Sequence, residues 1–134
     1  MSVFMKGRTT GQTTVELVHE SGAVIKTTAP KDNGGDGSSF SPTDLCASSL
    51  GACGATIMSM FARDKGILLE GIDFELTKEM SAAPRRIERI RVTFKLKGAF
   101  SEIDFRKLVA AGKTCPVRLT LGDRVEIIEE YLRF

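Results

Sequence analysis

A long segment of low charge between residues 42 and 65 limits what this chain can fold into. Apolar or small side chains occupy nearly every side of a helix drawn from Leu45 to Phe61. A helix that is apolar all round is a buried helix, because no side of it suits water. Its many Ala, Gly and Ser residues would let another backbone approach closely. We therefore expect a packed central helix and not a membrane span.

The ends of this helix carry clear local signals. Ser41 can act as the N-terminal cap, Pro42 occupies the first helical position, and Asp44 follows the cap by three residues. Gly66 can end the helix, because glycine accepts the backbone conformation that follows a last turn. These signals predict a helix over residues 42–65.

The segments before and after this helix alternate apolar and polar residues, which predicts strands and two hairpins. A second amphipathic helix is predicted over residues 101–111, with Ser101 as its cap, and a short helix begins at Pro116. The predicted strands cover residues 2–6, 13–19, 23–28, 72–80, 87–97 and 124–132. This order predicts a single α+β domain over residues 1–134.

The length, composition and net charge of the chain limit the kind of protein that it can be. Its 134 residues suffice for one domain with a real core, and its 42% apolar and 27% charged residues are ordinary for a soluble globular protein. The net charge of +2 gives no basis for a nucleic-acid or membrane surface, so we expect neither partner. The first residues do not read as a signal peptide, and three cysteines without an export signal favour a reducing compartment. We expect a cytoplasmic protein.

Cys115 stands directly before Pro116, which makes it the expected cap of the short helix. A sulfur at this position faces unpaired backbone N–H groups and the positive end of a helix dipole, and both favour a thiolate. Lys113 and Arg118 act in the same direction. The alternative is that Cys115 is a small apolar filler, since cysteine is often simply buried.

The other two cysteines lie on the long helix. Cys53 is in its middle, where burial alone makes a thiol inert, so activation would need a cation or donor from elsewhere in the fold. Cys46 precedes it by seven residues, about 10 Å along the helix axis, which excludes a disulfide between them while the helix persists. We expect Cys46 to be a packing residue.

Other chemistries have weak support. His19 is the only histidine, and the chain contains no CxxC, HxxxH or GxSxG motif. We expect no bound metal and no cofactor.

The segment SPTDLCASSLGACGATIMSMF, with TCPVRLTL about sixty residues later, resembles the osmotically inducible protein C / organic hydroperoxide resistance family (OsmC/Ohr). The shared pattern is a Ser-Pro helix start, a Leu-Gly-Ala-Cys in the helix, and a Cys-Pro-Val before the last strand. It covers nearly the whole chain in order and spacing. The resemblance implies an OsmC-like fold, in which antiparallel sheets wrap around long buried helices in an intertwined homodimer.

The resemblance also implies a thiol peroxidase that acts on organic hydroperoxides. On this match Cys53 is the peroxidatic cysteine and becomes a sulfenic acid, and Cys115 is the resolving cysteine and forms an intramolecular disulfide with it. A dithiol such as a lipoyl group is the implied reductant.

One position departs from the pattern. Peroxidases of this family use a glutamate ten residues before the helix cysteine, paired with an arginine, and here that position is Thr43. Asp44 is the candidate replacement, or it serves only the Ser41 cap, and Arg8 is the candidate arginine. The missing glutamate keeps an alternative open: a non-catalytic or redox-sensing dimer that binds a hydrophobic small molecule at its interface.

Overall fold

A computed structural model describes all 134 residues, which divide into two compact units, Met1–Cys46 and Ala47–Phe134. The long predicted helix begins in the first unit and lies mostly in the second. It is α1, Pro42–Lys65, and Gly66 follows it with a φ of 66°. Both predicted ends of this helix are confirmed.

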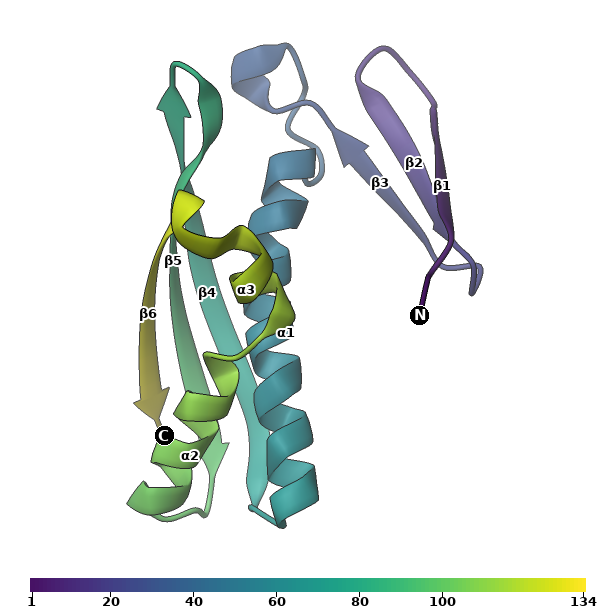
Figure 1. The fold of residues 1–134 in the computed structure, drawn as a ribbon. Coiled ribbons are helices and arrows are strands. Elements are labelled where there is room, and N and C mark those ends of the chain that lie inside the picture. The colour runs from purple at the N-terminus through teal and green to yellow at the C-terminus, as the bar shows by residue number, and fades with distance from the viewer. The chain divides into compact units, whose positions relative to one another are not determined.

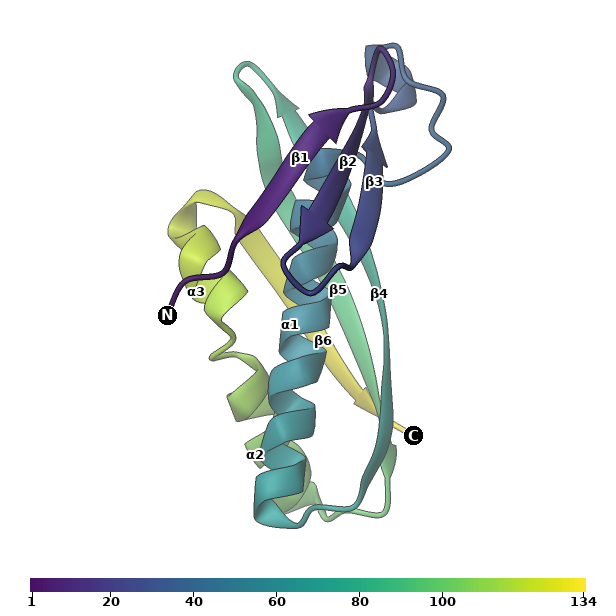
Figure 2. The ribbon, with the colours of Figure 1, turned by 90° about the vertical axis from the view of Figure 1, so that its right-hand side faces the viewer.

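The first unit contains a three-stranded antiparallel sheet in the order β1-β2-β3 (Figure 2). The predicted hairpin is confirmed, and the first strand starts later than predicted. Nearly all of these residues are exposed or half-buried, so the sheet has little core of its own within this unit. The elements are β1 (Met5–Thr9), β2 (Thr14–His19), β3 (Val24–Thr28) and a short 3-10 helix, η1 (Lys31–Asn33).

The second unit contains a three-stranded sheet in the order β4-β5-β6. Its strands are β4 (Leu69–Ala82), β5 (Arg85–Gly98) and β6 (Glu126–Arg133). β4 and β5 form the predicted antiparallel hairpin, but β6 runs parallel to β5. The prediction that both sheets are antiparallel is therefore wrong for this pair, because a helical connection returns the chain to the end of the sheet at which β5 begins.

Two helices form that connection, and they lie on the same side of the sheet as α1 (Figure 1). α2 (Glu102–Gly112) has the predicted cap, since Ser101 Oγ accepts a hydrogen bond from the Asp104 N–H at 3.1 Å. α3 (Pro116–Leu121) is followed by a 3-10 turn, η2 (Gly122–Arg124). The connection thus places the segment around Cys115 on the helix-covered face of the sheet.

The core of the second unit lies between the helices and the inner face of this sheet. The predicted alternation in β5 is confirmed, with every second side chain buried from Ile90 to Leu96. α1 approaches the sheet closely because Gly51 and Gly54 face it without side chains. Apolar burial of this kind is the main stabilising term for such a unit.

α1 buries only one of its sides within this chain. The buried residues follow a helical spacing: Ala47, Leu50, Gly51, Gly54, Met58 and Ala62. Met60 is 43% exposed and Cys46 is also exposed. The packing role of Cys46 stays a prediction. The sequence predicts burial of the remaining sides as well, and residues 47–134 by themselves do not supply it.

α1 is also long and apolar enough to span a membrane by length and composition, with a mean hydropathy of 1.5 over a window of 18 residues. Its inner side packs on aromatic side chains of the sheet, as a core helix does. A Cβ atom at Gly51 would stand 2.3 Å from Phe74 Cε2. This packing agrees with the prediction from the sequence that the segment is a packed central helix.

Candidate active site

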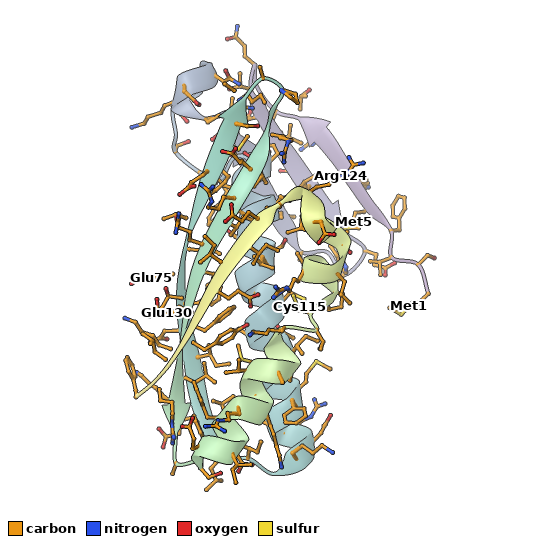
Figure 3. The ribbon with its side chains drawn as sticks, turned by 60° about the vertical axis from the view of Figure 1, so that its left-hand side comes forward. Met1, Met5, Glu75, Cys115, Arg124 and Glu130 are labelled. Atoms are coloured by element: carbon orange, nitrogen blue, oxygen red, sulfur yellow. The ribbon has the colours of Figure 1, made fainter.

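Cys115 is the N-terminal cap of α3, as predicted (Figure 3). Its backbone is extended, Pro116 follows at the first helical position, and its Sγ accepts a hydrogen bond from the Arg118 N–H at 3.3 Å. The side chain is 1% exposed. The Cys115 sulfur therefore caps the start of α3 and is at the same time buried in the core.

Burial decides the protonation of this thiol. Loss of water raises the pKa of Cys115 above its usual range, and this outweighs the lowering by the backbone N–H groups of Arg118 and Val117. Of the two alternatives for Cys115, its burial and raised pKa favour a buried apolar residue over a thiolate stabilised by the helix start in the reduced protein. The cap position is visible in the sequence, whereas the depth of burial is set by the helices and sheet around it.

Cys53 lies against Cys115. Its side chain is half-buried and packs on the same core, close enough to Cys115 to contribute to the raised pKa of that thiol. The structure thus brings together two cysteines that are 62 positions apart in the sequence. Two adjacent thiols can pass from a dithiol to a disulfide, which is a two-electron oxidation.

Two close contacts of α1 produce this adjacency. Next to Cys53, Gly54 packs directly on the Phe94 ring of β5. Further along α1, Met58 packs on Gly112 at the end of α2, where a Cβ atom would stand 3.0 Å from Met58 Cγ. The chain leaving α2 therefore starts close to α1, and Cys115 follows three residues later.

A partly buried polar cluster beside Cys115 was not predicted. Arg118 Nη1 donates a hydrogen bond to Glu129 Oε1, and the Tyr131 hydroxyl donates to Glu129 Oε2. The Glu129 side chain is 8% exposed. A signal was present in the sequence, because Glu129 falls on the inward side of the alternation in β6, where an apolar residue is expected.

The Tyr131 phenol is protonated at neutral pH. Burial raises the pKa of Tyr131 to about 12, with the positive charge of Arg118 opposing the shift and Cys115 adding to it. The ring stacks on Phe94 with 5.1 Å between centroids, and Lys113 Nζ lies 5.9 Å from its centroid. Tyr131 is therefore held as a hydrogen-bond donor to Glu129.

The two charged candidates, Asp44 and Arg8, lie in the first unit. The Ser41 N–H donates to Asp44 Oδ2 at 2.9 Å and the Asp44 N–H donates to Ser41 Oγ at 3.1 Å, so the capping role of Asp44 is confirmed. Arg8 Nε donates to Glu16 Oε1 at 3.2 Å, and the Arg8 side chain is 74% exposed. A catalytic role for either residue stays a prediction.

Residues 35–130 match the protein family described as OsmC-like protein. The chain is also 32% identical to a solved protein from Psychrobacter arcticus whose proposed role is in the osmotic stress induced and detoxification response. That match covers 100% of this chain and 96% of the other, with a TM-score of 0.87. No curated protein is significantly similar in sequence.

Two more distant structures share the fold. An OsmC-like protein from Mycoplasma pneumoniae is 17% identical, with a TM-score of 0.83 over 99% of this chain and 97% of the other. An organic hydroperoxide resistance protein OsmC from Legionella pneumophila is 19% identical, with a TM-score of 0.73 over 98% and 97%. At these identities the likeness concerns the fold alone.

Proposed function

Because this chain belongs to the OsmC-like protein family, we propose that it is a thiol-dependent peroxidase that reduces organic hydroperoxides. The observation that carries the proposal is that Cys53 and Cys115 lie close together on the same core. Distant relatives of the same fold, such as the Legionella pneumophila protein, are named for organic hydroperoxide resistance.

The proposed reaction has two steps. The Cys53 sulfur attacks the hydroperoxide, an S–O bond forms as the O–O bond breaks, and the alcohol leaves with a proton, so that Cys53 becomes a sulfenic acid. The Cys115 sulfur then attacks the sulfenic sulfur, an S–S bond forms, and hydroxide takes the thiol proton and leaves as water. A dithiol such as a lipoyl group returns the two electrons.

The different burial of the two thiols supports this division of roles. Cys115 is 1% exposed and protonated, and a protonated thiol is a poor nucleophile. Cys53 is only half-buried, so it is the thiol that a peroxide can reach. Cys115 then meets its electrophile only after Cys53 has been oxidised next to it.

The proposal includes a cytoplasmic homodimer without a metal or cofactor. Large apolar side chains are exposed in each unit, with Phe4 66% and Ile25 52% exposed in the first and Met60 43% exposed in the second. A second copy of the chain would bury such surface, which a soluble monomer rarely exposes in quantity. Arg8 and Asp44 are the proposed charged pair of the peroxidatic site.

A single-turnover experiment tests the proposal. The reduced protein, Cys53→Ser and Cys115→Ser are each treated with one equivalent of cumene hydroperoxide, and their thiols are mapped by peptide mass spectrometry. We expect a rapid Cys53–Cys115 disulfide, with a sulfenic acid trapped on Cys53 in Cys115→Ser. Thiols that stay reduced for minutes would contradict catalysis. That outcome, together with Thr43 at the glutamate position, would favour a dimer that binds a hydrophobic small molecule at its interface.

A further inference from the structure

The cluster of Arg118, Glu129 and Tyr131 takes no part in the two steps above, yet it is attached to the resolving cysteine. Arg118 contacts Cys115 through its backbone N–H and Glu129 through its guanidinium group. The same residue thus connects the sulfur of Cys115 to a buried carboxylate on β6.

A partly buried ion pair such as Arg118–Glu129 is a weak source of stability. Removing two charges from water costs about as much as their attraction returns, so an apolar pair of the same size would often serve the fold as well. The pair does, however, have strict geometry, because Glu129 accepts from both Arg118 and Tyr131. The pair therefore acts mainly by holding the side chains of α3 and β6 in fixed positions relative to each other.

α3 needs such an anchor. It has only six residues, none of them fully buried, and only Val117 and Leu121 among them pack partly on the core. The Arg118–Glu129 pair joins this short helix to β6, and Tyr131 is held in turn by its stack on Phe94. Movement of α3 would carry Cys115 away from Cys53.

Resting on the proposed peroxidase function, we propose that Glu129, together with Arg118 and Tyr131, positions Cys115 for the resolving step. The ion pair holds α3 on β6 and so keeps the Cys115 sulfur against Cys53. Its two opposite charges also balance each other beside the thiol. These are positioning residues, since they act on the reacting atoms through Cys115.

Because the charges of Arg118 and Glu129 balance each other, the proposal predicts how the pH dependence of disulfide formation changes when one of them is removed. Phe94 of β5 presents an apolar ring to this region, and ionisable groups come from three other elements and a loop. The titratable and charged groups around Cys115 are Cys53 of α1, Lys113 of the preceding loop, Arg118 of α3, and Glu129 and Tyr131 of β6. Removing one charge of the pair leaves the other without its partner in a partly buried site beside the thiol.

The test compares Glu129→Gln with Glu130→Gln. The second variant removes the same charge from the next residue of β6, whose exposed side chain lies on the outer face of the sheet (Figure 3). Each reduced protein is mixed with one equivalent of cumene hydroperoxide, and the Cys53 sulfenic acid and the disulfide are quantified over time at several pH values.

We expect Glu129→Gln to form sulfenic acid at the wild-type rate and to form the disulfide about tenfold more slowly or worse, because small misplacements are costly in such reactions. The pH at which disulfide formation is half-maximal should fall, since the remaining Arg118 cation favours the Cys115 thiolate. Arg118→Gln should raise that pH, and Arg118→Lys should restore part of the rate. Glu130→Gln should behave as wild type.

Equal disulfide rates and equal half-maximal pH values in Glu129→Gln and Glu130→Gln would overturn the proposal. Should Glu129→Gln fail to fold, judged by circular dichroism, Tyr131→Phe removes only one hydrogen bond to Glu129 and is expected to slow the same step. Should the wild type form no sulfenic acid, the peroxidase function fails separately. Diamide can form the Cys53–Cys115 disulfide without peroxide. Its rate of disulfide formation in each variant then still reports how closely the two thiols are held.

Discussion

A Cβ atom built on Gly54 would stand 2.8 Å from the Cζ atom of Phe94. The Phe94 ring is 1% exposed and stacked on Tyr131, so it has little room to move away. We expect Gly54→Ala to destabilise the protein by about 1–3 kcal/mol in urea unfolding, as overpacking does. Gly71→Ala is the control, because no atom lies within 4 Å of a Cβ there. Equal stability of the two variants would refute this account of the close approach.

The reciprocal hydrogen bonds between Ser41 and Asp44 at the start of α1 allow the capping role of Asp44 to be tested apart from a role in the peroxidatic site. Ser41→Ala and Asp44→Asn each remove part of the reciprocal hydrogen bonding, and each should cost about 0.5–2 kcal/mol of stability. If Asp44 also belongs to the charged pair of the site, only Asp44→Asn slows the oxidation of Cys53 by peroxide. Equal peroxide rates in the two variants would leave Asp44 as a cap alone.

Arg8 is tested by the reactivity of Cys53 and not by stability. Its exposed ion pair with Glu16 contributes at most about 1 kcal/mol, so Arg8→Ala should unfold almost as the wild type does. We expect Arg8→Ala to slow the alkylation of Cys53 by iodoacetamide at neutral pH, because a nearby cation favours thiolate. Glu16→Gln removes the same ion pair and keeps the cation, so it should not slow the reaction. An unchanged rate in Arg8→Ala would remove this residue from the site.

Cys46 should be dispensable for chemistry. Cys46→Ala is expected to keep peroxide consumption near the wild-type value, since its sulfur lies about two helical turns from Cys53. Because the residue is exposed in the single chain, the loss of stability should stay within about 0.5 kcal/mol. A loss of activity in a folded variant would contradict the separation of Cys46 from the site.

Alkaline pH should destabilise the reduced protein. The pKa of Cys115 is higher in the folded state than in the unfolded state, so the stabilisation is complete below the ordinary thiol pKa of about 8.5 and is lost as pH rises above it. The pKa of Tyr131, raised to about 12, acts in the same direction above about pH 10. Urea unfolding at about pH 7 and about pH 9.5 should therefore show a smaller difference for Cys115→Ala than for the wild type. Parallel losses in both proteins would show that burial of Cys115 is not a cause.

Local chemistry in the sequence was enough to place most elements. The Ser41 cap, Pro42 and the glycine after Lys65 define α1, and Pro116 with Cys115 defines the start of α3. Alternation in β5 predicted its buried face. These features depend on neighbours a few residues apart, so they can be read without knowing the fold. The pairing of Cys53 with Cys115, by contrast, came from a family resemblance.

Tertiary structure alone decided the direction of β6, the protonation of Cys115 and the cluster around Glu129. The parallel pairing of β6 depends on the path of α2 and α3, which no strand pattern records. Burial outweighs the cap at Cys115 because desolvation depends on every element packed around the sulfur. Arg118, Glu129 and Tyr131 likewise meet only because α3 lies over β6. Hydrogen bonding and turn chemistry are local, whereas dielectric environment and charge pairing are properties of the packed molecule.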